Sequence, residues 1–558
     1  MPRILLEAAQ LQKSFGEQTV LDIERIRIFD GERIALIGEN GAGKSTLLSI
    51  LSGETEPDSG FVRHYGSFAI IHQAGEARTN GNAHLISEFH VPDLRNGLSG
   101  GELTRRRIAE ALSQNTQLLF ADEPTTDLDA GGVERFRQFL TNFHGALVLV
   151  SHDRSLLNAL CTRVLHLEDG RITDFPGTYA DYQTELERRR AFQQFEYDQY
   201  RSEQARLKAL AQQKAEWAAS VKKAPKRMGN SEARLHKREY TNAMLHQSAA
   251  KKVVQNRMDR LEKKEHPRDL PDIRMTLGTA RPIEAKTAVS LQCSILQAGS
   301  RTLIQQAQFS LPASSRTALI GDNGSGKTTL LRILRGESSP EITFTGCIRI
   351  NPSVRMGFFD QDHAKSLNLD HTALENAMAS TQLPESMART VLARLNLQGD
   401  NVFKPVRVLS GGERAKIALA KLLLSESNLL ILDEPTNHLD LFTMEALEAL
   451  LAGYGGTLLF VSHDHAFVSA VATRILSIDK GNLSVFEGTL QQMEYDTRRT
   501  RKGESIQLEI SALEMRMAAL SARMSAPKKG DRPELLNEQY DALASELKAL
   551  KQQFVHHK

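Results

Sequence analysis

The chain has 558 residues, more than one hydrophobic core usually serves, so at least two domains are expected. Its 41% apolar and 25% charged residues are ordinary for a folded soluble protein, and 70 basic side chains nearly balance 68 acidic ones. Three cysteines without a CxxC pair exclude a disulfide framework or structural zinc site and favour a reducing cytosol. No signal peptide is expected, and the apolar runs are far shorter than the ~20 residues that span a bilayer. We therefore expect a cytoplasmic protein with no membrane partner.

The first motif is a glycine-rich loop between an apolar strand (33–37) and an apolar helix (47–51). In this GxxxxGKS pattern the glycines let backbone N–H groups surround phosphates, the lysine reaches the outer phosphates and the serine ligates magnesium. ATP and Mg²⁺ are therefore the expected cofactors. The residues expected to contact nucleotide here are Gly38, Asn40, Gly41, Gly43, Lys44, Ser45 and Thr46.

Four residues farther along the first half are candidates for metal binding and catalysis. Asp122 ends an apolar strand, where a parallel sheet places a carboxylate close to magnesium. Glu123 follows it, in position to orient or deprotonate the attacking water. Gln73 ends a short strand and is a candidate magnesium ligand. His152 follows another strand, and we expect a neutral imidazole there at the terminal phosphate.

The second half repeats these motifs in the same order. Each half contains an LSGGE segment, at 98–102 and at 409–413. From its Leu to the acidic Glu is 25 residues in both halves, and from that Glu to the His is 29. A period near ~300 residues is too long for a solenoid, so the chain contains a duplicated domain. The residues of the second half expected to contact nucleotide are Gly321, Asn323, Gly324, Gly326, Lys327, Thr328 and Thr329. The candidate magnesium ligands are Thr328, Gln361 and Asp433, and the candidate catalytic pair is Glu434 and His463.

Each motif alone has a plainer explanation. A single glycine loop can be a turn with a surface lysine, an isolated DEP tripeptide usually caps a turn, and a lone histidine after a strand is more often structural. The matched order and spacing of two copies favour nucleotide hydrolysis over these explanations.

A long helical hairpin is expected between the two copies. Residues 181–224 contain no Gly or Pro, a break follows at Pro225 and Gly229, and a second helix reaches about Pro267. Such a hairpin would extend roughly 50–60 Å at 1.5 Å per residue. Residues 181–270 carry 21 basic and 13 acidic side chains, a net charge of +8. The basic residues near the expected tip are Lys222, Lys223, Lys226 and Arg227.

A charge run usually marks a solvated helix face, but this one lies on a loop at the end of a lever. Contacts with RNA phosphates are therefore its natural role. Trp217 lies one turn before the loop, where burial between the helices and stacking on a base both stay open. Residues 498–558 are expected to form a helix to about 524, a break at 527–530 and a second helix.

Two phosphate loops, two LSGGE segments and two strand–Asp–Glu–Pro segments resemble the ATP-binding cassette (ABC) superfamily. Without a transmembrane part and with a long interdomain hairpin, the chain is similar to the ABC-F family of ribosome-associated ATPases. The resemblance implies an α/β fold with two ABC-type P-loop nucleotide-binding domains, at 1–180 and 285–497. It also implies that a long α-helical hairpin linker (181–284) joins them and that a C-terminal helical extension (498–558) follows.

The family further implies a monomer whose two domains close head to tail around ATP, so that each LSGGE caps the nucleotide held by the other domain. Ser99 would cap the ATP on Lys327, and Ser410 the ATP on Lys44. The LSGGE residues expected to contact nucleotide are Ser99, Gly100, Gly101, Ser410, Gly411 and Gly412.

One branch of the family is the better match. Housekeeping ABC-F factors commonly carry a helical arm before the first LSGGE, but only 25 residues separate Gln73 from Leu98, against 48 between Gln361 and Leu409. The segment 224–237 and the C-terminal extension resemble the antibiotic-resistance branch, which inserts its hairpin through the ribosomal E site and helps dislodge bound drug. This implies the ribosome as partner, with 23S rRNA near the peptidyl transferase centre and P-site tRNA in reach of the tip.

Two departures separate the halves. Phe15 stands where the family places an aromatic to stack on adenine, but the matching position in the second half is Ala298, so we expect non-equivalent ATP sites. The first half also reads Thr126–Asp127 where the second has Asn437–His438. A housekeeping ABC-F factor, the ATPase subunit of a membrane transporter, and a DNA-repair or chromosome-structuring ATPase are the alternatives.

Overall fold

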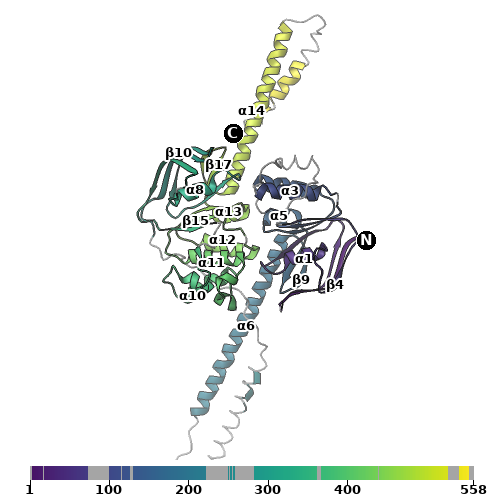
Figure 1. The fold of residues 1–558 in the computed structure, drawn as a ribbon, viewed down its shortest axis with the longest axis vertical. Helices are drawn as coiled ribbons and strands as arrows, with labels where there is room; N and C mark the ends of the chain where they lie inside the picture. Colours follow the sequence, from purple (N-terminus) through teal and green to yellow (C-terminus); the bar gives the residue numbers. More distant parts are fainter. Residues whose placement is uncertain are drawn as a thin grey trace, which may run out of the picture.

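The computed structural model describes residues 3–16, 18–72, 100–114, 116–125, 128, 130–220, 249, 252–253, 256–257, 282–337, 339–360, 366–437, 439–525, 539–548 and 550–551. The repeat forms two α/β cassettes that lie side by side (Figure 1). Each cassette has a six-stranded sheet and a three-stranded antiparallel sheet. We call the cassette that ends with β9 the first and the one that begins with β10 the second.

The described residues of the first cassette form nine strands: β1 (Ile4–Phe15), β2 (Gln18–Phe29), β3 (Arg33–Gly38), β4 (Ser59–His64), β5 (Phe68–Ile71), β6 (Leu118–Asp122), β7 (Ala146–Val150), β8 (Arg163–Glu168) and β9 (Arg171–Pro176). Its described helices are α1 (Lys44–Leu51), α3 (Gly100–Leu112), α4 (Ala130–Asn142) and α5 (Arg154–Leu160).

The large sheet of the first cassette has the order β5-β6-β7-β3-β8-β9, with all strands parallel except β9. β7 is apolar throughout and β6 is apolar up to its last residue, Asp122, and both are buried along their whole length, as strands covered on both faces require. Since β3, β6 and β7 are parallel neighbours, the loops that follow them meet at one edge of the sheet.

The second cassette repeats this plan in the order β14-β15-β16-β12-β17-β18, with β18 antiparallel. Its strands are β10 (Thr287–Ala298), β11 (Arg301–Pro312), β12 (Arg316–Gly321), β13 (Ile342–Ile350), β14 (Met356–Phe359), β15 (Leu429–Asp433), β16 (Thr457–Val461), β17 (Arg474–Asp479) and β18 (Asn482–Glu487). Its helices are α8 (Lys327–Leu334), α9 (Ala373–Met378), α10 (Glu385–Arg394), η2 (Gly399–Phe403), η3 (Val406–Val408), α11 (Gly411–Leu423), α12 (Leu441–Ala452) and α13 (His465–Val471).

Three hydrophobic clusters hold the cassettes. One lies within each cassette, between the antiparallel sheet, the large sheet and the helix after the phosphate loop. The third runs through both cassettes and includes Phe136 of the first, Phe460 of the second and Tyr179 at the root of the linker. The two cassettes therefore pack as one body.

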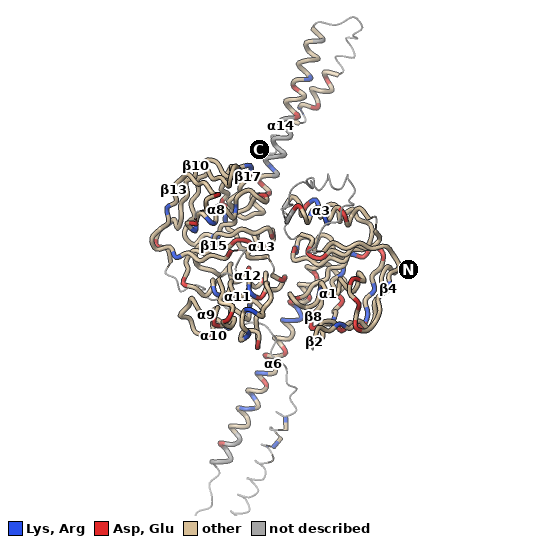
Figure 2. Tube along the Cα trace, in the orientation of Figure 1, with Lys and Arg blue, Asp and Glu red and all other residues tan. Residues whose placement is uncertain are grey.

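Two long helices leave this body in opposite directions (Figure 1): α6 (Tyr179–Ser220), which opens the linker, and α14 (Leu490–Ser525). At 1.5 Å per residue, the 42 residues of α6 extend about 63 Å. Basic and acidic residues are interspersed along α6 (Figure 2), so its described part is a solvated, mixed-charge lever.

Both long helices begin earlier than residues 181 and 498, where the sequence pattern placed them. Thr178 and Asp181 exchange hydrogen bonds at the start of α6, with Thr178 N donating to Asp181 Oδ2 at 2.9 Å. Thr489 and Gln492 do the same at the start of α14, with Thr489 N donating to Gln492 Oε1 at 2.9 Å. These reciprocal caps fix the first turn, and composition alone did not reveal them.

The expected fold class is confirmed: the two halves of the chain form α/β domains in tandem. In the described part of the chain, no helix combines the length and the apolar character that crossing a membrane requires. The expected hairpin tip lies outside the described residues, and of the returning helix only 249, 252–253 and 256–257 are described, all helical. The domain limits expected from the sequence, 1–180, 181–284, 285–497 and 498–558, stay predictions.

Candidate ATP-hydrolysis sites between the cassettes

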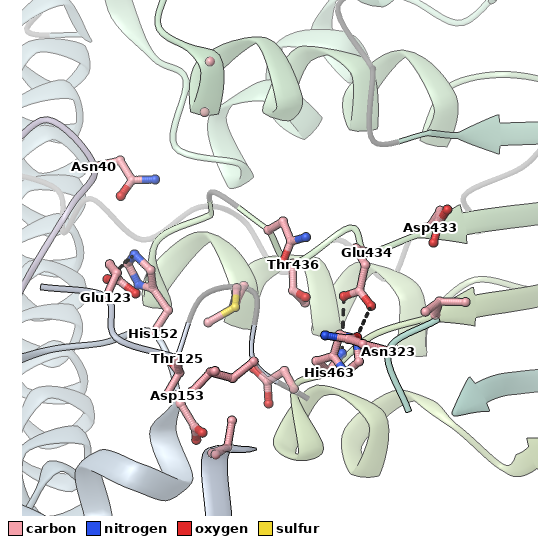
Figure 3. A pocket seen from close by; sticks show the side chains of 18 of the residues that line it. Asn40, Glu123, Thr125, His152, Asp153, Asn323, Asp433, Glu434, Thr436 and His463 are labelled. Carbon is pink, nitrogen blue, oxygen red and sulfur yellow. Dashed lines mark hydrogen bonds and ion pairs between the residues drawn. The ribbon is translucent and has the colours of Figure 1, made fainter. Parts of the chain in front are cut away.

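A cavity of about 1620 Å³ lies between the cassettes. Pockets for one small ligand typically measure ~300–1,000 Å³, so this cavity has room for two nucleotides. Glu123 and His152 lie on one side and Glu434 and His463 on the other (Figure 3). The expected nucleotide-binding residues that line it are Phe15, Asn40, Gly41, Gly43, Lys44, Ser45, Thr46, Asn323, Gly324, Gly326, Lys327, Thr328, Thr329, Ser410, Gly411 and Gly412.

Each glycine-rich loop joins the end of a central strand to a helix, α1 or α8, whose N-cap is glycine. Gly43 and Gly326 have φ of 100° and 102°, a left-handed conformation that favours glycine. A Cβ on Gly43 would lie 2.7 Å from Val20 Cγ1, so a side chain has no room there. The loops thus present backbone N–H groups at a helix N-terminus, as an anion site requires.

The two loop lysines are held inside these turns. Lys44 Nζ donates to Gly38 O at 2.8 Å and to Glu39 O at 2.9 Å, and Lys327 Nζ donates to Gly321 O at 2.7 Å. Burial lowers the pKa of Lys44, against the carboxyl groups around it, Glu123 first. Burial deprives this ammonium group of water. A phosphate bound beside it would stabilise its positive charge in place of that water.

The residues expected at magnesium lie together in pairs. Ser45 hydrogen-bonds Asp122 in the first cassette, and Thr328 hydrogen-bonds Asp433 in the second. Burial raises the pKa of both aspartates, and Asp433 Oδ1 is buried and accepts no hydrogen bond from the described residues. A hydroxyl beside a buried carboxylate fits Mg²⁺, which takes its remaining ligands from phosphate and water. Gln73 and Gln361 lie outside the described residues.

The candidate catalytic carboxyl groups follow the magnesium aspartates directly. Glu123 Oε1 lies 3.0 Å from His152 Nε2, and Glu434 Oε1 lies 3.3 Å from His463 Nε2 (Figure 3). Burial raises the pKa of Glu123 to about 8 and that of Glu434 to about 7. Burial also lowers the pKa of His152 to about 4, so its imidazole is neutral near pH 7.

Both glutamates have a backbone conformation that costs free energy. Their φ angles are 47° for Glu123 and 50° for Glu434, in the left-handed region where a residue other than glycine costs ~1–3 kcal/mol. Each is held there by its own N–H, which donates to Val150 O at 2.9 Å and to Val461 O at 3.0 Å. The neighbouring strand therefore aims each carboxyl group into the cavity.

The second LSGGE segment forms the N-terminus of α11. Ser410 is its N-cap and exchanges hydrogen bonds with Glu413: Ser410 N donates to Glu413 Oε2 at 2.9 Å, and Glu413 N donates to Ser410 Oγ at 3.3 Å. Ser410 lines the same cavity as Lys44 of the other cassette, which is the head-to-tail arrangement expected from the family. In the first segment, Gly100 and Gly101 begin α3, and Ser99 lies outside the described residues.

Sequence reasoning missed several residues at this interface. Asp440 is buried, caps α12, pairs with Lys416 Nζ at 3.0 Å and accepts a 3.5 Å hydrogen bond from Asn40 N of the first cassette. It ends the LDEPTNHLD segment, so its repeated position was the available signal. Arg154 and Glu448, which pair across the cassettes, lie outside every recognised motif.

The edge of each site differs between cassettes. Phe15 is 56% exposed at the end of β1 and lines the cavity, where it can stack on a base. In the second cassette Ala298 pairs with Arg301 across the β10–β11 turn, and Arg301 lines the cavity. A Cβ on Gly324 of the phosphate loop would lie 3.3 Å from Arg301 Nη1. At the edge of the second site, a guanidinium group therefore lies next to Ala298, the residue that matches Phe15 of the first site.

Comparisons with known proteins agree with this geometry. A family model described as ABC transporter matches residues 22–80 and 304–437. The ribosome protection protein VmlR of Bacillus subtilis (strain 168) is 34% identical over 479 residues, covering 84% of this chain and 85% of VmlR. The erythromycin resistance ATP-binding protein MsrA of Staphylococcus epidermidis is 33% identical over 485 residues, covering 85% of this chain and 97% of MsrA.

The ATP-binding protein Uup of Escherichia coli (strain K12) is 29% identical over 84% of this chain and 79% of Uup. Among solved structures, the archaeal ribosome recycling factor aABCE1, in complex with the ribosomal stalk protein aP1, matches with a TM-score of 0.58 and 19% identity, over 88% of this chain and 92% of that one. That structural likeness supports the tandem fold. The chain therefore belongs to the ABC-F family of ATP-binding cassette proteins and is an ATP-hydrolysing ATPase.

Proposed function

We propose that this protein is a ribosome-binding ABC-F ATPase that protects the ribosome from antibiotics bound in the peptidyl transferase centre. It inserts its interdomain hairpin through the E site, contacts 23S rRNA and P-site tRNA with the hairpin tip, and uses ATP hydrolysis for release. It acts in the cytoplasm as a monomer.

The observation that carries the proposal is likeness, over 84% and 85% of the chain, to VmlR, named as a ribosome protection protein, and to MsrA, named as an erythromycin resistance ATP-binding protein. Two features of the chain support it. The segment before the first LSGGE is short, and the linker is long and carries a net charge of +8 over residues 181–270. A linker with this excess of basic residues suits a partner made of RNA.

The residues lining the cavity supply the chemistry of hydrolysis. Lys44 and Lys327 with their glycine loops hold the phosphates. Ser45 with Asp122, and Thr328 with Asp433, would hold Mg²⁺, which would offset phosphate charge when bound. Glu123 and Glu434 orient the attacking water and accept its proton, and His152 and His463 contact the terminal phosphate. Ser99 and Ser410 complete each site from the opposite cassette.

The position of the linker root explains how ATP can control the hairpin. Tyr179, the first residue of α6, is 1% exposed and belongs to the cluster shared by both cassettes. A helix rooted there turns with the cassettes when they close on ATP. The long helix then converts a small rotation at the body into a large movement at the tip.

The housekeeping ABC-F factor is the second candidate, because Uup and the Bacillus subtilis protein YdiF, whose names give ATP binding and no resistance, are 29% identical to this chain over similar lengths. Both candidate functions involve ATP hydrolysis and binding to the ribosome. They differ in whether the protein restores translation that a drug has stopped.

The test is in vitro translation with a lincosamide, a streptogramin A, a pleuromutilin or erythromycin, with and without added protein. We expect rescue from the first three drugs ahead of erythromycin. Rescue from none of them, together with stimulation of drug-free translation, would replace resistance with the housekeeping role.

Two hairpin variants sharpen this test. Changing Lys222, Lys223, Lys226 and Arg227 to Gln removes up to four phosphate contacts, so ribosome affinity should fall and its salt dependence should flatten. Deleting residues 224–228 should leave ribosome binding and ATPase activity largely intact while protection is lost. Protection that survives the deletion would remove the tip from the mechanism.

A further inference from the structure

Helix α12 of the second cassette is fastened to the first cassette at two points. At its N-terminus, Asp440 Oδ2 accepts a 3.5 Å hydrogen bond from Asn40 N in the phosphate loop. Two turns along, Glu448 pairs with Arg154: Arg154 Nη1 donates to Glu448 Oε2 at 3.2 Å and Arg154 Nη2 donates to Glu448 Oε1. Both points belong to the ATP site built on Lys44: Asn40 lies on its phosphate loop, and Arg154 lies two residues after its histidine, His152.

The Arg154–Glu448 pair is shielded and reinforced. Each side chain is only 13% exposed, and Glu445 Oε1 lies 3.9 Å from Arg154 Nη1. Tyr179 Oη and Gln183 Nε2 of α6 donate to Glu445 Oε1. We call Arg154, Glu445 and Glu448 the cross-domain brace, and it also touches the linker root. A shielded charge pair with several hydrogen bonds holds geometry better than an exposed one.

Arg154 is coupled to the catalytic loop through the chain itself. It is the first residue of α5, whose N-cap is Asp153, and His152 precedes that cap. Asp153 Oδ1 accepts hydrogen bonds from Ser155 N at 2.9 Å and Leu156 N at 3.1 Å, so the loop and the helix move as one unit. Any shift of Arg154 therefore shifts His152 relative to Glu123.

The matching positions of the other half carry different residues. His465 follows His463 as Arg154 follows His152, and Arg137 follows Asp129 by eight positions as Glu448 follows Asp440. Arg137 pairs with Glu134 of its own helix at 2.6 Å, and His465 Nδ1 lies 3.4 Å from Glu494 of α14. Two basic side chains cannot form an ion pair, so these positions give no equivalent of the brace.

We propose that Arg154 is a positioning residue for ATP hydrolysis at the site built on Lys44, where it fixes the His152 loop against α12 of the second cassette. Among the described residues, His465 and Arg137 give the site built on Lys327 no such tie. This rests on the proposed roles of Glu123 and Glu434, which a separate control tests below. The brace makes hydrolysis at the first site depend on full docking of the second cassette and on the position of the linker root.

The experiment isolates each site in the full-length protein. Glu434→Gln leaves the first site active, and Glu123→Gln leaves the second. In each background, kcat and KM for ATP are measured with Arg154→Gln, with Glu448→Gln and with the charge reversal Arg154→Glu/Glu448→Arg. Arg137→Gln is the matched control, since Arg137 occupies the corresponding place in α4 and pairs within its own helix.

We expect Arg154→Gln and Glu448→Gln to lower kcat of the first site roughly tenfold, because small misplacement of a catalytic group is costly, with KM little changed. The second site should change less than about twofold, the charge reversal should recover part of the loss, and Arg137→Gln should leave both sites unchanged.

Equal losses at both sites would make the brace a general structural contact, and no loss at the first site would overturn the proposal outright. If Arg154→Gln does not fold, Glu448→Gln, which keeps shape and an acceptor oxygen, decides between these outcomes. The double variant Glu123→Gln/Glu434→Gln tests the proposed catalytic role of the glutamates separately from the proposed positioning role of Arg154. Full ATPase activity in it would disprove the roles of the glutamates, whereas lost activity with an unaffected Arg154→Gln would disprove the brace alone.

Discussion

The two cassettes share their phosphate chemistry and differ at their edges. Asp122 pairs with Val150 across β6 and β7 as Asp433 pairs with Val461 across β15 and β16, and both following glutamates have the same left-handed backbone. By contrast, Phe15 faces one site and Arg301 the other, and in the described part of the chain the brace joins the His152 loop to the opposite cassette while His465 and Arg137 form no matching pair. Duplication preserved what hydrolysis requires and let the base contact and the docking surface diverge.

Changing both catalytic glutamates should have the largest effect. Glu123→Gln with Glu434→Gln removes the groups that act on the attacking water and leaves the phosphate contacts, so turnover should fall ~10²–10⁴-fold while ATP binding persists. Steady-state hydrolysis and equilibrium ATP binding check this. Wild-type turnover in the double variant would show that the shared core is not the catalytic one.

Breaking the buried Lys416–Asp440 pair should be the next largest effect. Their side chains are 5% and 0% exposed, so Lys416→Met strands a buried carboxylate and should cost about 3–5 kcal/mol in unfolding free energy. Lys404→Met, at an exposed position, should stay within ~0.5 kcal/mol. Urea unfolding measures both, and similar values for the two variants would contradict the assigned importance of the pair.

The pH dependence of the two sites should differ. Burial raises the pKa of Glu123 to about 8 and of Glu434 to about 7, and only the ionised carboxylate accepts a proton. Activity is therefore lost as pH falls through each raised pKa. The kcat/KM profile, which reports free-enzyme groups, should rise near pH 8 in Glu434→Gln and near pH 7 in Glu123→Gln. Superimposable pH profiles of kcat/KM in the two variants would contradict the difference in pKa between Glu123 and Glu434.

Contacts at the base should give the smallest effect. Phe15→Ala removes a stacking surface worth ~1–3 kcal/mol and should weaken nucleotide binding at the first site roughly tenfold. Arg301→Ala removes a cation–π partner worth ~0.5–1 kcal/mol, so the second site should weaken about two- to fivefold and discriminate less between ATP and GTP. Ala298→Leu, which adds no stacking surface, should change affinity less than Phe15→Ala. Site-resolved titrations with ATP and GTP measure these values, and equal effects of Phe15→Ala and Ala298→Leu would remove the asymmetry.

Much of the site could be predicted because its chemistry restricts residue type and spacing. Lys44, Asp122 and Glu123 lie where a phosphate, a metal and a water need them, and their strands are short apolar runs that only a covered sheet buries. The same reasoning placed Lys327, Asp433 and Glu434.

Docking between cassettes could not be predicted in this way. Arg154 and Glu448 are 294 positions apart and lie on helix surfaces, where a charged residue looks like any other until the partner surface is known. Arg301 was missed because its role depends on the turn that places it opposite Ala298. The starts of α6 and α14 were misplaced because a cap depends on two side chains and not on composition.

The most direct test of the account is sedimentation of the Glu123→Gln/Glu434→Gln variant with ribosomes and, separately, with membranes, in ATP and in ADP. The account predicts that the ATP-bound variant pellets stoichiometrically with ribosomes, that ADP releases it and that membranes do not retain it. Failure to pellet with ribosomes in ATP, or ATP-dependent retention on membranes, would contradict the ribosomal function and favour the transporter alternative.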